Sequence, residues 1–142
     1  MPRPLGTPIG LHLAQVARTA SRAFDDSLTD AGGSLPVWLV LIALKSRVLA
    51  NQRELAEAVG IQGPTLTHHL NAMESAGLVT RRRHPENRRV HVVEMTPAGE
   101  ELFTRLRDAA TTFDKRLRAG FSGAEIATIE ALLTRLGANL QT

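Results

Sequence analysis

Two short helical patterns that meet at Gly60 constrain the fold of this chain more than any other feature of its sequence. The first pattern begins at Asn51, which stands in an N-cap position with Glu54 three residues later. Ala56 is small enough for two helices to touch, and Gly60 permits the left-handed backbone of a tight turn. Apolar residues flank this turn at Val59, Ile61 and Leu66. The combination predicts a helix-turn-helix, whose second helix enters the major groove of DNA.

The second helix of this pair is expected to run from near Pro64 to Ser75 or Ala76, and its two faces differ in character. At about 100° per residue, Leu66, Leu70 and Met73 fall on one face and should be buried. The opposite face and its flanks are small, polar and free of acids, and they comprise Pro64, Thr65, Thr67, His68, Asn71, Ala72 and Ser75. Such a face suits the major groove, where side chains read base edges. The predicted DNA contacts are Gln62, Pro64, Thr65, Thr67, His68 and Asn71.

A basic hairpin is expected directly after this pair of helices. Strands are predicted over Leu78–His84 and Arg88–Met95, because β-forming runs flank the turn residues Pro85-Glu86-Asn87. Between residues 81 and 89 the hairpin carries one acid, Glu86, among its arginines, which are Arg81, Arg82, Arg83, Arg88 and Arg89. A cluster of this kind indicates contact with a polyanion, and the alternative is a hairpin whose charges are simply solvated.

Further helical patterns lie on both sides of this central segment. The first helix is expected over Ile9–Ala31, where a pair of glycines ends it. The next helix starts after Ser34 as N-cap and is apolar nearly all round, so it should be the central buried element. The last two helices are expected to begin at Pro97 and after Ser122, the latter with a capping box.

The predicted fold is mainly α with a small β-hairpin wing, in a single domain spanning residues 1–142. The winged helix-turn-helix should occupy about residues 35–95, and dimerisation helices about residues 9–31 and 97–140. The last helix carries a stripe of large aliphatic residues, Ile126, Ile129, Leu132, Leu133, Leu136 and Leu140. The helix before it would exceed about 30 Å in length, more than so small a domain needs. Both features predict a two-fold homodimer, with the aliphatic stripe in its interface.

The stretch Leu66–Arg81 resembles the recognition helix and first wing strand of the MarR family of bacterial regulators, with Met73 in place of a leucine. The segment Pro85-Glu86-Asn87-Arg88-Arg89 resembles the wing of that family, and Met95-Thr96-Pro97-Ala98-Gly99 resembles the entry into its next helix. The resemblance extends over nearly the whole chain, from Ile9 to Leu140. His84 and Asn87 depart from the family pattern, because they replace the two acids of its wing.

The resemblance implies a triangular homodimer that represses transcription from a near-palindromic operator. In the family, the first, fifth and sixth helices pair across the two-fold axis, and the two winged regions bind successive major grooves of double-stranded DNA. Arg88 and Arg89 then contact DNA from the wing, beside Arg81 of the same cluster. Because the wing acids that hold arginines in the family are replaced, Arg88 and Arg89 are expected to be less fixed here.

Many members of the family release DNA when a phenolic or other aromatic compound binds. For this chain we predict a pocket for a small aromatic acid, lined by His12, Val16 and Trp38, because ligand pockets are apolar clefts with few polar groups. The alternative is that Trp38, the only tryptophan, simply packs in the core. The sequence identifies neither the operator nor the effector.

An enzyme, a cofactor and a metal site are not expected. The chain has no cysteine, which rules out disulfides and thiolate ligands. Adjacent residues such as His68 and His69 point about 100° apart on a helix and do not chelate one ion. No glycine-rich phosphate loop or nucleophile motif is present. The alternative function is a winged-helix module that binds protein without sequence-specific DNA binding.

The chain is expected to act in the cytoplasm and not to associate with a membrane. Its N-terminus lacks the apolar core of a secretion signal. The longest nearly apolar run, Leu35–Leu44, is too short to span a bilayer.

Overall fold

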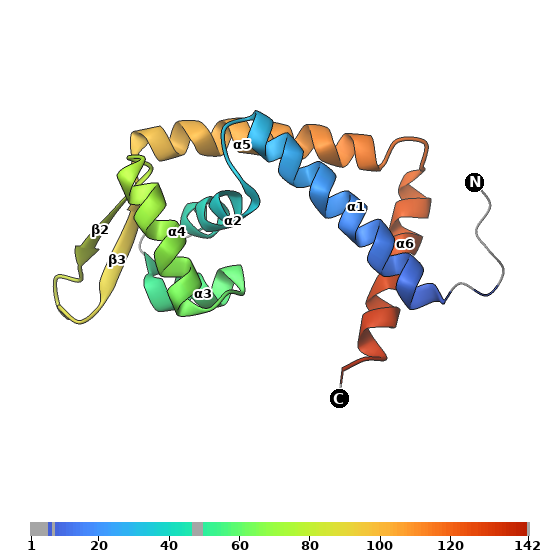
Figure 1. Cartoon of the computed structure of the whole chain (residues 1–142), viewed down its shortest axis with the longest axis horizontal. Helices are drawn as coiled ribbons and strands as arrows, with labels where there is room; N and C mark the ends of the chain where they lie inside the picture. The colour runs from blue at the N-terminus through green and yellow to red at the C-terminus, as the bar shows by residue number, and fades with distance from the viewer. Residues whose placement is uncertain (1–5, 7, 47–49, 142) are drawn as a thin grey trace. The chain divides into compact units, whose positions relative to one another are not determined.

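The computed structural model describes residues 6, 8–46 and 50–141 of the chain. Its elements are, in order, α1 (Ile9–Asp30), α2 (Leu35–Lys45), β1 (Ala50–Asn51), α3 (Gln52–Val59), α4 (Gly63–Ser75), β2 (Val79–Arg83), β3 (His91–Met95), α5 (Pro97–Leu117) and α6 (Gly123–Ala138) (Figure 1). The predicted class, mainly helical with a small hairpin, is confirmed. The chain divides into two compact units, residues 1–110 and residues 111–142, which are described separately. The single domain predicted from the sequence stays a prediction.

α2 is the central helix of the first unit. Its N-cap is Ser34, whose Oγ accepts a hydrogen bond from the backbone nitrogen of Val37 at 3.3 Å. The helix packs against α1, α3, α4 and β3. Its buried side chains are Trp38, Val40, Leu41, Ala43 and Leu44. The prediction that this apolar helix forms the middle of the core is therefore confirmed.

α3 and α4 form the expected helix-turn-helix. Asn51 caps α3, because its Oδ1 accepts a hydrogen bond from the backbone nitrogen of Glu54 at 2.8 Å. Gly60 adopts φ 78° and ψ 31°, the left-handed conformation that the turn requires. The backbone nitrogens of Gly60 and Ile61 both donate to the carbonyl oxygen of Ala56, at 2.9 and 3.1 Å. The turn is therefore closed by hydrogen bonds to Ala56, the small residue that was predicted to lie where the two helices touch.

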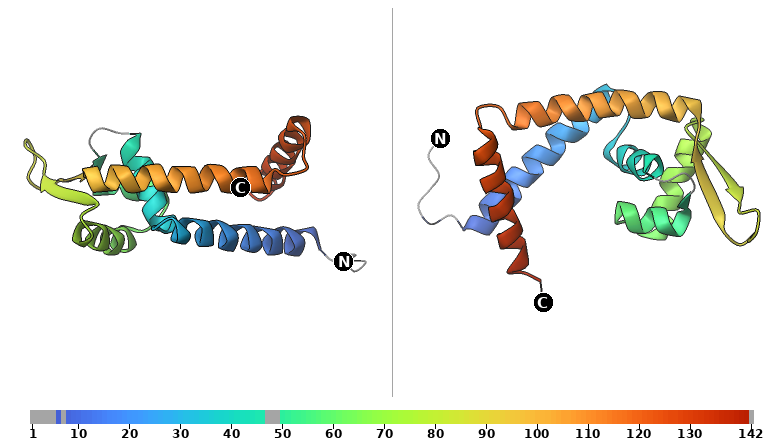
Figure 2. Two further views of the ribbon diagram at one scale, coloured as in Figure 1. Left: turned by 90° about the horizontal axis from the view of Figure 1, so that it is seen from above. Right: turned by 180° about the vertical axis from the view of Figure 1, so that it is seen from behind.

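The sheet has three antiparallel strands in the order β1-β3-β2. β1 was not expected from the sequence, and it pairs Ala50 and Asn51 with Val93 and Val92. The second strand of the hairpin was predicted to begin at Arg88, and this was wrong, because β3 begins only at His91. Residues 84–90 form a turn longer than the predicted one, and it projects from the first unit beyond α3 and α4 (Figure 2).

The start of α5 closes the core of the first unit. Thr96 Oγ1 accepts from the backbone nitrogen of Gly99 at 3.1 Å and donates to the carbonyl oxygen of Gly77 at 2.6 Å. Leu102 and Leu106 of α5 are buried in the same apolar cluster as α2. Among the described residues no single helix has the length and apolar character to cross a membrane, although the bent pair α1 and α2, at 76°, satisfies length and composition.

The second unit contains the end of α5 and all of α6. The predicted capping box is present: Ser122 Oγ accepts from the backbone nitrogen of Glu125 at 3.1 Å, and Glu125 Oε1 accepts from that of Ser122 at 2.9 Å. None of the described residues of α6 is buried. The helix was expected to continue to Leu140, and this was wrong, because α6 ends at Ala138.

Candidate nucleic-acid interface

The exposed face of α4 carries side chains that were predicted to meet DNA. Pro64, Thr65 and His68 are exposed in the N-terminal half of the helix, and Gln62 is exposed at its N-cap. The buried face is the predicted one, formed by Leu66, Leu70 and Met73. His69 is half-buried at the edge of that face, and the centroid of its ring lies 5.6 Å from that of His68. The helix therefore presents polar groups outward from a rigidly packed row of apolar residues.

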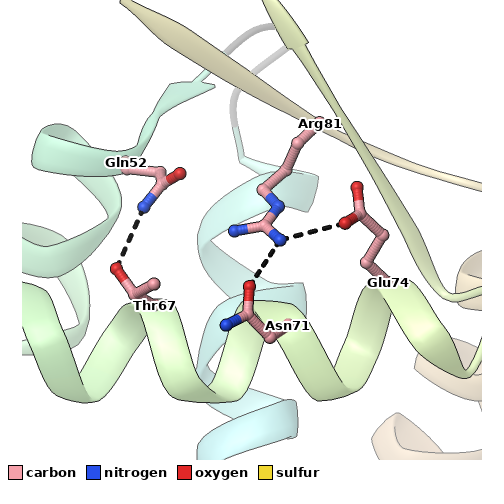
Figure 3. Close-up of polar contacts among 5 residues, drawn as sticks. All are labelled: Gln52, Thr67, Asn71, Glu74 and Arg81. Carbon is pink, nitrogen blue, oxygen red and sulfur yellow. Dashed lines mark hydrogen bonds and ion pairs between the residues drawn. The ribbon is translucent and has the colours of Figure 1, made fainter.

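Thr67 holds the two helices of the motif together. Its Oγ1 accepts a hydrogen bond from Gln52 Nε2 at 3.3 Å (Figure 3). The same hydroxyl donates to the carbonyl oxygen of Gly63 at 3.1 Å, so it is engaged within the motif. Sequence reasoning missed Gln52. The signal that could have identified Gln52 is its position: it directly follows the N-cap of α3, on the side of that helix that faces α4.

Arg81 connects the first wing strand to α4 (Figure 3). Side chains alternate along β2, so Arg81 lies on the same face as the buried Val79. Its Nη2 donates to Asn71 Oδ1 at 2.5 Å and to Glu74 Oε1 at 2.9 Å. The Arg81 side chain is only 18% exposed. The hydrogen bond from Arg81, with its positive charge, holds the pKa of the Glu74 carboxyl below its ordinary value.

Two of the predicted DNA contacts, Arg81 and Asn71, therefore bind each other. Arg81 Nη2 and Asn71 Oδ1 are engaged in a bracket between β2 and α4, which gives both residues a positioning role in the structure. Glu74, the third member, was not among the predicted site residues. Its involvement depends on how β2 lies across the end of α4, which the spacing of seven residues between Glu74 and Arg81 does not fix.

The turn of the wing is held by two side chains that accept from its own backbone. His84 Nδ1 accepts from the backbone nitrogen of Glu86 at 3.1 Å. Asn87 Oδ1 accepts from the backbone nitrogen of Arg89 at 3.2 Å. These are the two residues that stand where the resembled family has acids. Both serve as local acceptors that shape the turn, a common use of asparagine.

Arg88 and Arg89 are the free cations of the wing. Both are exposed in the turn, and neither side chain forms an ion pair within residues 50–141 and the earlier described segments. The other arginines of the cluster are engaged: Arg82 pairs with Glu94 at 2.5 Å, and Arg83 Nη1 donates to the carbonyl oxygen of Arg88 at 3.1 Å. The two arginines of the cluster whose side chains have no partner among the described residues therefore lie at the tip of the hairpin.

The three residues predicted to line an effector pocket are not brought together in one chain. Trp38 is 9% exposed and stacks on Phe103 of α5, with ring centroids 5.5 Å apart and planes 24° apart. His12 lies about 27 Å along the axis from the end of α1, at 1.5 Å per residue, and α2 then leaves at 76°. His12 is half-buried and Val16 exposed on α1. The geometry supports core packing for Trp38, the alternative weighed from the sequence.

The residues predicted for the dimer interface are accessible in the single chain. Ile126 is half-buried, and the exposed members of the stripe are Ile129, Leu132, Leu133, Leu136 and Leu140. The N-terminal half of α1 also exposes apolar side chains, namely Ile9, Leu11, Leu13 and Val16. Within the described ranges no group of three or more histidine, cysteine, aspartate or glutamate side chains is placed to hold a metal ion.

The model of a known protein family, described as the MarR family, matches residues 34–91, from the cap of α2 to the start of β3. A candidate regulator of the hcr operon of Thauera aromatica is 30% identical over 129 residues, which cover 90% of this chain and 78% of the relative. The match therefore spans both the winged segment and its flanking helices.

Solved structures share the fold over nearly the whole chain. A transcriptional repressor, CouR, bound to a 23-mer DNA duplex, is 26% identical with a TM-score of 0.82, covering 99% of this chain and 100% of the other. BpsR of Bordetella bronchiseptica, whose DNA binding is regulated by 6-hydroxynicotinic acid, is 20% identical with a TM-score of 0.81, covering 96% and 98%.

Proposed function

The chain belongs to the MarR family of winged helix-turn-helix transcriptional regulators, and we propose that it represses transcription by binding a near-palindromic operator as a homodimer. As a regulator of this family it is not an enzyme. The observation that carries the proposal is the exposed, acid-free N-terminal half of α4 beside a wing whose tip carries two unpaired arginines. A solved repressor of the same fold is bound to DNA, which supports the repressing role.

Each contact class has a distinct task in the proposed complex. Thr65 and His68 read base edges from the outer face of α4, with Gln62 as a third donor or acceptor. Arg88 and Arg89 contact phosphates or the neighbouring minor groove, which supplies affinity with little sequence information. The two-fold axis then sets two half-sites whose centres lie about 10 bp apart.

Dimerisation is supported by the apolar surface that the helices outside the winged segment leave uncovered. Four large aliphatic side chains of α6 are between 37% and 48% exposed: Ile129, Leu132, Leu133 and Leu136. Such contiguous apolar surface on a single chain marks an interface. A second copy of the same chain is the partner that closed two-fold symmetry favours.

Release by a small aromatic acid is the regulatory part of the proposal. It is supported by likeness in fold to BpsR, which is regulated by 6-hydroxynicotinic acid. His12 and Val16 remain candidates for the pocket, whereas Trp38 is covered. Adding salicylate at millimolar concentration should weaken DNA binding, and cyclohexanecarboxylate, which matches its charge without the aromatic ring, should not. Equal effects of the two acids would contradict an aromatic effector.

The operator role is tested by selecting bound duplexes from a random pool and then titrating salt on the selected and a scrambled duplex. A sequence-specific regulator should enrich a motif with two related half-sites and bind it at least about 10³-fold more tightly than scrambled DNA. A protein-binding winged module would enrich no motif. The Arg88→Ala, Arg89→Ala double variant should weaken binding to both duplexes and flatten the salt dependence; unchanged binding would contradict the wing assignment.

A further inference from the structure

Two grooves meet at the first turn of α3. One, of about 540 Å³, lies along the helix-turn-helix and reaches the start of α4 at Gly63. The other, of about 400 Å³, lies between α3 and the base of the wing. Both are lined by Gln52 and Arg53, so the two grooves adjoin at these residues, and we refer to the pair of grooves as the trough. Gln52 is fixed there by its hydrogen bond to Thr67.

The wing end of this trough is basic. Its lining residues are Asn51, Gln52, Arg53, Arg89, Val90 and His91, and no acid is among them. Arg53 comes from α3 and Arg89 from the wing turn, so two elements far apart in the sequence each contribute an arginine to the lining of one groove. Guanidinium groups present a fork of donors that matches phosphate oxygens, and a histidine ring adds a further N–H donor.

Arg53 has one ion-pair partner among the described residues, and that pair is weak. Its Nε lies 3.6 Å from Oε1 of Glu57, one turn later on α3, and the two side chains are 90% and 71% exposed. Exposed pairs at this spacing contribute about 0.3–0.5 kcal/mol. A phosphate at the trough would therefore displace Glu57 from Arg53 at small cost, whereas the Arg81 bracket has no comparable freedom.

We propose that the trough seats the phosphate backbone of one DNA strand, that Arg53 is its central phosphate contact, and that Glu57 is a built-in competitor for that arginine. The proposal rests on the proposed DNA-binding function and adds to it a residue that lies outside α4 and the wing tip. The first helix of a helix-turn-helix crosses the DNA backbone, which is where the trough runs. Arg53 then joins the contacts of α4 to those of Arg89 along a single strand.

The test compares three full-length variants on the selected operator duplex over a salt titration. Arg53→Ala should lower the magnitude of the slope of log affinity against log salt by about 1.8, because a bound dimer loses two phosphate contacts at about 0.9 each. Because the contact carries no sequence information, affinity should fall by the same factor on the scrambled duplex. Glu57→Gln should tighten binding of the dimer about fourfold, which is about twofold for each freed surface pair. Arg107→Ala on α5 removes the same charge outside the trough and should behave as the wild type.

The outcomes separate the trough from the proposed function. If the wild type selects and binds an operator but Arg53→Ala keeps its slope and affinity, the trough proposal is wrong and the DNA-binding function stands. If Arg53→Ala and Arg107→Ala lose affinity equally, the effect is one of net charge and the trough proposal is also wrong. If the wild type binds no duplex, the proposed function fails, and the trough proposal fails with it.

Discussion

Arg81 illustrates how a charged residue in a basic cluster acquires a structural task. Its guanidinium sits between Asn71 and Glu74 of the recognition helix, while Arg88 and Arg89, further along the hairpin, remain exposed. From the sequence alone, Arg81, Arg88 and Arg89 were all predicted to contact DNA. The difference arises because alternation along β2 turns Arg81 toward the core side, and the turn leaves the other two at the tip.

The Glu74–Arg81 pair predicts an acid-dependent loss of stability. The pKa of Glu74 is lowered in the folded chain, so the pair stabilises the protein above the ordinary pKa of 4.5, and this contribution is lost as the pH falls through the lowered value. Glu74→Gln should therefore lower the Tm at neutral pH, and the gap from the wild type should close progressively below pH 4.5. Thermal unfolding across a pH series measures it.

Glu101→Gln is the control for this comparison. Glu101 is an exposed glutamate on α5 without an ion pair among the described residues, so its replacement should leave the difference from the wild type constant with pH. A constant difference for Glu74→Gln as well would mean that the bracket contributes nothing to stability through the charge of Glu74.

His68 is the residue for which base reading makes the sharpest prediction. It is exposed in the N-terminal half of α4, on the side of the helix opposite the buried Leu66 and Leu70. His68→Ala should cost about 1–3 kcal/mol of binding free energy on the operator and much less on scrambled DNA. Ser75→Ala, at the far end of the same face, should change neither. Equal losses for His68→Ala on both duplexes would rule out base reading by this residue.

At the scale of elements, local signals in the sequence were sufficient for the helices and insufficient for the sheet. Caps at Ser34, Asn51 and Ser122 and the left-handed Gly60 mark helix ends by rules that involve only neighbouring residues. β1 is two residues long and exists through its pairing with β3, some forty positions later, so no local periodicity announces it. The late start of β3 goes with two local hydrogen bonds within the turn, in which the side chains of His84 and Asn87 accept from backbone nitrogens two residues later.

The junction of the wing with α5 predicts a position that tolerates only glycine. A Cβ at Gly99 would lie 2.2 Å from the carbonyl oxygen of Leu78 and 2.7 Å from Cγ of Met95. Because one of these neighbours is backbone, relief requires α5 to shift from the sheet. Gly99→Ala should lower the free energy of unfolding by about 1–3 kcal/mol or more, as overpacked cores do. Denaturant unfolding measures the change.

Gly10→Ala is the matched control, since a Cβ at this helical position meets no atom within 4 Å. That substitution should be neutral or stabilise by about 0.4–1 kcal/mol, because alanine restricts the unfolded chain more than glycine does. If Gly99→Ala were equally harmless, the close approach of α5 to the end of the wing would not be part of the folded structure.

At the scale of the whole molecule, the main structural question is which surface packs against the apolar stripe of α6. Its hydrophobic pattern was readable from the sequence, but periodicity alone does not distinguish a helix packed within its own chain from one that meets a partner. In this chain α6 has no buried residue among those described, although its stripe includes Ile129, Leu132 and Leu136. The second copy proposed above is the simplest cover for this surface.

Leu132→Asp tests that interface. A carboxylate placed in a desolvated apolar seam is very costly, so the variant should sediment as a monomer and lose operator affinity. Thr134→Asp adds the same charge to α6 two residues away, on a different side of the helix, and should remain dimeric. A Leu132→Asp protein that sediments as a tight dimer would show that α6 is not the dimer seam.

The stacking of Trp38 on Phe103 gives the protein an internal optical probe. The chain has one tryptophan and no tyrosine, so its near-ultraviolet emission comes almost entirely from the indole of Trp38. That indole reports on the packing of α2 against α5, because its neighbour Phe103 belongs to α5. Its emission should be blue-shifted in the native chain and move to longer wavelength when α5 separates from α2. Changes in the packing of α2 against α5 can therefore be followed in the unlabelled protein, in the presence of DNA that does not itself fluoresce.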